Sequence, residues 1–141
     1  MRIGVIGSGY VGLVSAACFA EIGHDVISVD NDIEKIAMLE RGEVPIHERF
    51  LPELLARHRG HRLRFSTSVR EAVECSDVVF ITVGTPQSEA GEADLSFVEA
   101  VAQKIASAIR DPPQISLYLR SISLPPPVVS DRRATPAPGI A

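Results

Sequence analysis

Short apolar runs alternate with amphipathic segments over the first 110 residues of the chain. The apolar runs are typical of strands and occupy residues 3–6, 24–29, 63–66 and 77–83. Apolar residues three or four positions apart predict helices over residues 11–22, 33–41, 69–75 and 96–109, and a further helix starts near Pro52. Strands that alternate with helices predict an α/β fold with a doubly wound, Rossmann-type, mainly parallel sheet.

Several residues are expected to begin, end or orient these helices. Gly23 and Gly42 fit left-handed caps after the first two helices. Asn31 or Asp32 fits the start of the second helix, and capping boxes are predicted at 68–71 and 96–99. The spacing predicts these inward-facing residues: Val11, Val14, Cys18 and Ile22 in the first helix, and Ile33, Ile36, Ala37 and Leu39 in the second.

A glycine-rich turn joins the first strand to the first helix. Gly7, Gly9 and Gly12 form the G-x-G-x-x-G pattern, and Asp30 closes the second strand eighteen residues after Gly12. In a dinucleotide-binding fingerprint, the first glycine permits the tight turn and the second lets the backbone approach a pyrophosphate. The third lets the helix pack close to the sheet. The alternative interpretation is a tight turn without a ligand, but strand, turn, helix, second strand and acid all agree here.

The fingerprint also indicates which dinucleotide is bound. The helix start presents free N–H groups and a positive dipole end to phosphates. Asp30 is placed to accept hydrogen bonds from the adenosine ribose, and its carboxylate repels a 2′-phosphate. No arginine follows directly, since residues 31–33 are Asn, Asp and Ile. NAD is therefore favoured over NADP, in a cleft that also includes the end of the 77–83 strand at 84–86.

Composition and charge exclude several other classes of protein. The net charge is −4, which argues against a nucleic-acid partner. No apolar run has the length of a membrane span and no signal peptide precedes the first strand, so a cytoplasmic location is expected. Cys18 and Cys75 are interpreted as small buried residues. The four histidines form no ligand pair, so no metal site is predicted.

The composition changes after Arg110, where seven of the ten prolines lie between Pro112 and Pro138. Prolines cannot continue a helix or lie in a central strand. Alternating apolar residues at 115–119 fit one edge strand, and disorder is expected beyond Leu124. We therefore expect an NAD-binding domain over 1–110 with an incomplete sheet, followed by an aberrant proline-rich tail over 111–141.

Several longer strings resemble the UDP-glucose/GDP-mannose dehydrogenase family, especially its UDP-glucose-oxidising members. The strings occupy residues 7–13, 42–48, 76–86 and 93–99. The resemblance covers Met1 to about Ile109, and no string from Asp111 onward matches. The hydroxyacyl and phosphogluconate dehydrogenases are competing Rossmann families, and the string at 45–55 argues against them. The resemblance implies that these residues contact the cofactor: Gly7, Gly9, Tyr10, Val11, Gly12, Asp30, Lys35 and Thr85.

The resemblance also implies a chemistry and a limit to it. The family oxidises the C6 alcohol of a nucleotide sugar to a carboxylate with two NAD, and its members are homodimers joined by a central helix. The catalytic cysteine, lysine, asparagine and glutamate of the family lie in segments that have no counterpart here, so no catalytic residue is assigned. We expect a truncated or frame-shifted NAD-binding part that is inactive alone. The alternatives are a non-catalytic NAD-binding module and an unstable fragment.

Overall fold

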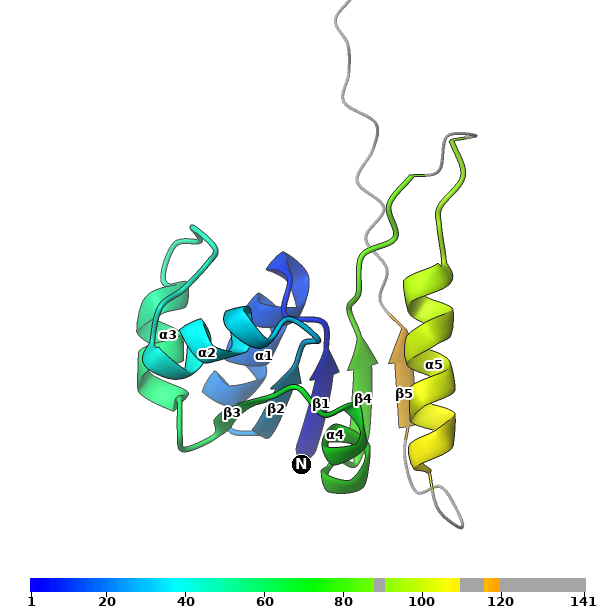
Figure 1. The fold of residues 1–141 in the computed structure, drawn as a ribbon. Helices are drawn as coiled ribbons and strands as arrows, with labels where there is room; N and C mark the ends of the chain where they lie inside the picture. The colour runs from blue at the N-terminus through cyan, green and yellow to red at the C-terminus, as the bar shows by residue number, and fades with distance from the viewer. Residues whose placement is uncertain (88–90, 110–115, 120–141) are drawn as a thin grey trace, which may run out of the picture.

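The computed structural model describes residues 1–87, 91–109 and 116–119, and it contains one parallel sheet (Figure 1). The strand order is β3-β2-β1-β4-β5, with every neighbouring pair parallel. The strands are β1 (Arg2–Ile6), β2 (Asp25–Val29), β3 (Leu63–Ser66), β4 (Val78–Ile81) and β5 (Ser116–Leu119). The doubly wound α/β fold predicted from the alternating pattern is confirmed, including an edge strand after Arg110.

Helices cover both faces of this sheet and create two apolar clusters. The helices are α1 (Tyr10–Glu21), α2 (Ile33–Arg41), α3 (Leu51–His58), α4 (Val69–Cys75) and α5 (Ser96–Ala108). Residues of α1, α2 and α3 pack with Ile3, Val5 and Val26 on one face of the sheet. Residues of α4 and α5 pack with Ile6 and Ile27 on the other face. Side chains alternate between faces along a strand, so β1, β2 and β4 contribute to both clusters.

The order of the strands places a crevice at the carboxyl edge of the sheet. The chain passes from β1 outward to β2 and β3, then returns to β4 on the other side of β1. The loops after β1 and β4 therefore run to opposite faces of the sheet. This reversal of direction is the switch point at which open α/β sheets bind ligands.

Local signals in the sequence begin and end most of these helices. Gly23 and Gly42 have φ values of 101° and 90°, in the left-handed region expected of them. The Asp32 side chain accepts a hydrogen bond from the Lys35 N–H, and Ser68 accepts one from the Glu71 N–H. The reciprocal half of the 68–71 capping box is replaced, because the Glu71 carboxylate accepts instead from the Ser66 hydroxyl.

The inward face predicted for α1 is wrong except at Val14, which is half-buried against the core. Its buried residues are Gly12, Leu13, Ala16, Ala17 and Ala20. Cys18 is exposed, Ile22 is 69% exposed, and Cys75 in α4 is half-buried, so neither cysteine is the buried residue expected. Apolar residues occupy nearly the whole circumference of α1, and a 3.6-residue period then cannot select one face. Small alanines lie against the sheet because they allow the closest approach.

Two further predictions about helices are wrong. The 96–99 capping box is absent, and the Asp94 carboxylate accepts the Ser96 N–H instead. Ile33 in α2 is 73% exposed rather than turned inward, whereas Ile36 and Leu39 are buried as expected. The disorder expected beyond Leu124 lies outside the described residues.

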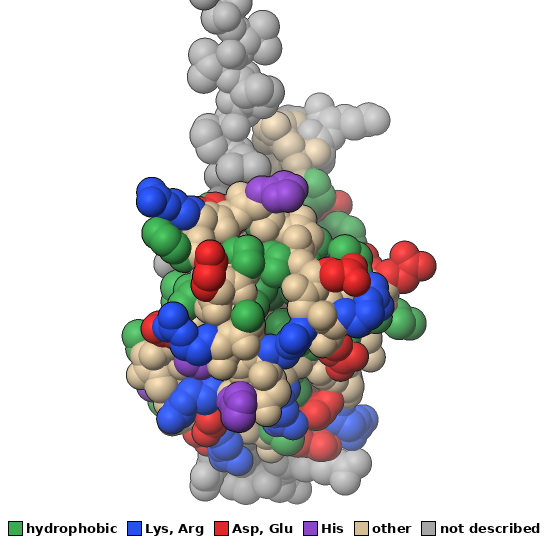
Figure 2. Space-filling view, turned by 90° about the vertical axis from the view of Figure 1, so that its left-hand side faces the viewer, with side chains coloured by type: hydrophobic (Ala, Val, Ile, Leu, Met, Phe, Trp, Pro, Cys, Tyr) green, Lys and Arg blue, Asp and Glu red, His purple; other side chains and the backbone are tan. Residues whose placement is uncertain are grey.

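Charged side chains of both signs are interspersed over the face that α2 and α3 present (Figure 2). Many of them are paired across elements. Glu21 of α1 accepts from Arg57 and also lies within hydrogen-bond distance of His58, both in α3. Within the described part of the chain, no helix is both long enough and apolar enough to span a membrane.

Candidate functional site

A cleft of about 320 Å³ lies at the carboxyl edge of the sheet, where the strand order reverses. The loops after four strands, β1 to β4, and residues of α2, α4 and α5 line it. The glycine turn contributes Gly7 and Gly9, the end of β2 contributes Asp30, and the end of β4 contributes Thr82 to Gly84. Residues Phe97 to Lys104 of α5 form its far wall. The cleft therefore joins segments from both halves of the described chain.

The glycine turn leaves the first turn of α1 open toward this cleft. Gly7 has φ 106°, and its N–H donates to the Val29 carbonyl at 2.7 Å. Gly9 precedes α1, and no side chain caps the helix among the described residues. A Cβ on Gly9 would meet no atom within 4 Å, so open space lies in front of it. Uncapped N–H groups beside open space form an anion-binding arrangement.

The Asp30 carboxylate is buried at the centre of the polar wall, with only 9% of its side chain exposed. Its Oδ2 accepts from the Ser8 N–H at 2.8 Å and from Lys35 Nζ at 3.0 Å, while Oδ1 accepts from the Asp32 N–H at 3.1 Å. Burial alone would raise the pKa of Asp30, but these three donors outweigh it and hold the pKa below its ordinary value. The group is therefore an anion at neutral pH.

Tyr10 connects the glycine turn to the loop before α3. Its hydroxyl donates to the Glu48 carboxylate at 2.7 Å, and this hydrogen bond raises the pKa of Tyr10. Phe50 in the same loop has φ 67° and lies beneath the Arg49 guanidinium, 4.7 Å from the ring centroid. This left-handed backbone is one that glycine adopts more readily than phenylalanine does.

The structure brings four of the eight predicted cofactor residues into the wall of the cleft: Gly7, Gly9, Asp30 and Lys35. Tyr10, Val11 and Gly12 form the first turn of α1 directly behind the glycine turn. Thr85 follows Gly84, which lines the cleft, and is itself half-buried. The sequence therefore predicted the glycine turn and the acid correctly as neighbours.

The residues of the other walls were not predicted from the sequence. The cleft is also lined by Thr67 after β3, Val69 at the start of α4, Thr82 at the end of β4, and Phe97 and Lys104 of α5. Thr82 and Phe97 lie in the family strings 76–86 and 93–99, but nothing in those strings indicated that these two side chains face the cleft. Phe97 is 55% exposed at the rim, an apolar ring with room for a ligand beside it.

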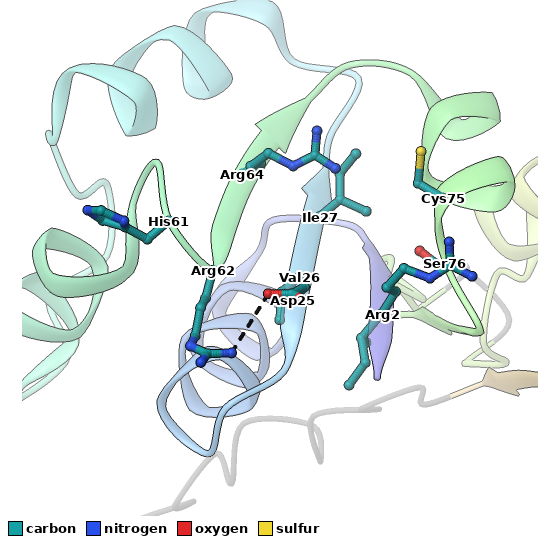
Figure 3. A pocket seen from close by; sticks show the side chains of 10 residues that line it. Arg2, Asp25, Val26, Ile27, His61, Arg62, Arg64, Cys75 and Ser76 are labelled. Atoms are coloured by element: carbon teal, nitrogen blue, oxygen red, sulfur yellow. Dashed lines mark ion pairs between the residues drawn. The ribbon is translucent and has the colours of Figure 1, made fainter.

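A second cavity, of about 350 Å³, lies at the opposite edge of the sheet, near the amino ends of the strands (Figure 3). It is lined by Arg2, Arg62 and Arg64, and each is already paired: Arg2 with Asp77, Arg62 with Asp25 at 3.8 Å, and Arg64 with Glu71 at 3.7 Å. No glycine turn or helix start among the described residues opens into it. The first cleft is therefore the better dinucleotide site.

Comparison with known proteins agrees with this geometry. Residues 1–121 match the model of the NAD-binding domain of the UDP-glucose/GDP-mannose dehydrogenase family. The chain belongs to this family. NAD is thus the cofactor of the matched domain, as the carboxylate of Asp30 predicted. The match extends past Ile109, where the resemblance was expected to end, and it includes β5.

The relatives are longer proteins. The chain is 50% identical over 112 residues to the UDP-glucose 6-dehydrogenase of Rhizobium meliloti. This alignment covers 78% of this chain and 26% of that protein. It is 42% identical over 127 residues to the GDP-mannose 6-dehydrogenase of Pseudomonas aeruginosa. That alignment covers 89% of this chain and 29% of that protein. The chain therefore spans about a quarter of the length of the curated relatives it matches.

Solved structures in the family have the same fold over this region. The GDP-mannose dehydrogenase structure from Pseudomonas aeruginosa superimposes with a TM-score of 0.80 at 42% identity, over 89% of this chain and 29% of that chain. The UDP-glucose dehydrogenase structure from Pyrobaculum islandicum gives a TM-score of 0.77 at 37% identity, over 85% and 28%. Both matches place the described sheet within the family's cofactor domain.

Proposed function

We propose that the chain holds NAD in the cleft at the carboxyl edge, with the pyrophosphate against the glycine turn. The observation that carries this proposal is the contact between the buried Asp30 carboxylate and the Ser8 N–H of that turn at 2.8 Å. It fixes the ribose-binding acid and the phosphate-binding backbone in one arrangement. The N–H groups of Tyr10 and Val11, in the first turn of α1, would then face the phosphates.

The two ends of the cleft suit the two halves of the dinucleotide. We assign the adenosine half to the end where Asp30 and Lys35 lie, with Thr67 and Lys104 nearby. The nicotinamide half then extends toward Gly84, and Thr85 comes to lie beside it. Lys35 would share the ribose with Asp30, because its ammonium group already lies 3.0 Å from the carboxylate. Gly12 acts indirectly, by allowing α1 to pack behind the turn.

The ribose contact predicts discrimination between dinucleotides. A carboxylate accepts hydrogen bonds from ribose hydroxyls and repels a 2′-phosphate, so NAD is expected to bind and NADP to bind much more weakly. Replacing Asp30→Arg should weaken NAD binding by about tenfold or more, which is about 1.4 kcal/mol. Isothermal titration calorimetry measures the affinities of the wild type and the variant for NAD and for NADP. Glu40→Arg, the same change of charge at an exposed position of α2, serves as the control. Unchanged affinity for NAD in Asp30→Arg would remove this residue from the site.

We further propose that the whole protein is a UDP-glucose 6-dehydrogenase and that these 141 residues alone bind NAD without turnover. Support for the substrate comes from relatives: those named UDP-glucose 6-dehydrogenase reach 50% identity, and those named GDP-mannose 6-dehydrogenase reach 42%. The proposed inactivity is supported by length, because the chain spans only about a quarter of the length of these relatives. Incubation with UDP-glucose and NAD should produce no NADH absorbance, and steady NADH production would contradict this expectation.

A further inference from the structure

One peptide group of the glycine turn is held from both of its sides. The Gly7 carbonyl accepts a hydrogen bond from the Thr82 hydroxyl at 2.8 Å. The Ser8 N–H, at the other side of the same peptide unit, donates to the Asp30 carboxylate at 2.8 Å. Because a peptide group is planar, these two contacts together fix how the plane between Gly7 and Ser8 is turned.

Thr82 is built rigidly into the neighbouring strand ladder. Its backbone N–H donates to the Ile6 carbonyl at 2.8 Å, so the residue extends the pairing between β4 and β1. Its side chain is buried, with 9% of the residue exposed. The hydroxyl also lies 3.0 Å from the Ile6 carbonyl, but it has a single hydrogen, and Gly7 offers the shorter contact.

The Gly7 carbonyl has little freedom to find another donor. A Cβ added to Gly12 would collide with this oxygen, so α1 packs directly against it. A Cβ added to Gly7 would come within 2.8 Å of the Thr82 carbonyl oxygen. Without the hydroxyl of Thr82, the carbonyl would lose its protein donor in a crowded, partly buried place, and leaving such an acceptor without a partner costs free energy.

We propose that Thr82 is a positioning residue of the cofactor site, one that orients the glycine turn through the Gly7–Ser8 peptide. The inference rests on the proposed NAD site and assigns it a residue outside the glycine fingerprint. With that peptide fixed, the N–H groups that follow, from Gly9 into the first turn of α1, point at the pyrophosphate before it arrives. Binding then requires no reorganisation of the turn.

Three substitutions separate this role from simple stabilisation of the sheet. Thr82→Val keeps the shape of the side chain and removes the donor, whereas Thr82→Ser keeps the donor. Ser28→Ala is the matched control: it removes a buried hydroxyl that bonds to the Ser8 hydroxyl at 3.0 Å, from the strand on the other side of β1. Thr82→Ala also lacks the donor and adds no bulk, so it replaces the valine variant should that variant not fold.

The readouts are NAD affinity by calorimetry, unfolding by urea, and hydrogen exchange of the Ser8 amide without cofactor. We expect Thr82→Val to bind NAD about tenfold more weakly, equal to about 1.4 kcal/mol, with faster exchange at Ser8. Thr82→Ser should restore both. Ser28→Ala should lose stability and keep its affinity.

Two results would overturn the inference: wild-type affinity and wild-type Ser8 exchange in Thr82→Val, or an equal loss of affinity in Ser28→Ala. Failure of the unmodified protein to bind NAD would instead contradict the proposed function. In that case the exchange of the Ser8 amide still tests the role of Thr82, because it needs no cofactor.

Discussion

The carboxylate of Asp30 stays charged in a place where burial favours the neutral acid. Three donors, the Asp32 N–H, Lys35 Nζ and the Ser8 N–H, outweigh the desolvation and lower its pKa. A carboxyl group with a lower pKa in the folded state than in the unfolded chain stabilises the fold when it is ionised. That contribution is complete above the unfolded-state pKa and is lost as pH falls through the folded-state value.

This linkage gives a prediction for acid denaturation. The ordinary pKa of the group is 3.8, and the folded-state value lies below it, so the contribution of Asp30 should disappear in acid below about pH 4. Asp30→Asn should lower the free energy of unfolding at pH 7 by about 1–2 kcal/mol. The further fall of this free energy on acidification should be smaller in the variant than in the wild type. Urea denaturation across this pH range measures both. Asp25→Asn is the control, and an acid response identical to wild type in Asp30→Asn would contradict the prediction.

Sequence spacing predicted some of the residues that line the cleft, because spacing is tied to backbone geometry. Asp30 comes at the end of the strand next to β1, and Gly7 requires a positive φ, so both follow from a local pattern. Thr82 does not, because its partner is set by the register between two strands far apart in sequence. A threonine at a strand end is common, and only the fold shows that its hydroxyl contacts the Gly7 carbonyl.

At the scale of an element, the turn and the first turn of α1 contain two glycines with opposite constraints. A Cβ on Gly12 would collide with the Gly7 carbonyl and come 2.5 Å from the Thr82 hydroxyl oxygen. A Cβ on Gly9 would meet nothing within 4 Å, and Gly9 has an ordinary φ of −73°. Gly12 is therefore needed for packing, whereas Gly9 leaves a space that no protein atom fills.

Substituting Gly12 should reduce stability, whereas substituting Gly9 should reduce NAD binding. Gly12→Ala should destabilise the domain by about 1–3 kcal/mol or more, since a methyl group has no space there. Gly9→Ala should fold with nearly wild-type stability and bind NAD at least about tenfold more weakly, because the methyl group occupies the path of the pyrophosphate. Thermal melts and calorimetry distinguish the two effects. A Gly9→Ala variant that binds NAD normally would show that the phosphates lie elsewhere.

The helices show where pattern-based prediction loses its power. The ends of α2 were predicted to the residue because Asp32 and Gly42 act locally. Apart from Val14, the face of α1 was predicted wrongly because apolar side chains surround that helix, and contact with β1 and α3 decides which of them are buried. Capping at α5 was predicted wrongly because the loop before the helix puts Leu95 at the N-cap position, and the Asp94 carboxylate there accepts the Ser96 N–H.

For the whole molecule, the question is how far the domain extends. The sequence predicted a boundary at residue 110, from the prolines that follow. β5 lies beyond this point and pairs along β4, from Val78 with Ser116 to Ile81 with Leu119. Without β5, β4 would become the edge of the sheet, with its hydrogen-bonding groups open to other chains. The strand thus contributes both pairing and protection of the apolar centre of the sheet.

Two truncations decide between these boundaries. A chain of residues 1–121 keeps all five strands and the full extent of the family match, so it should melt like the 141-residue chain and bind NAD equally well. A chain of residues 1–110 should melt at least several degrees lower, because a loss of about 1 kcal/mol lowers Tm by about 4–8 °C in a small domain. It should also aggregate at lower concentration, through the uncovered edge of β4. Calorimetric melts and light scattering measure these effects. Equal stability of the two truncations would place the boundary at 110 and make β5 an accessory to a four-stranded domain.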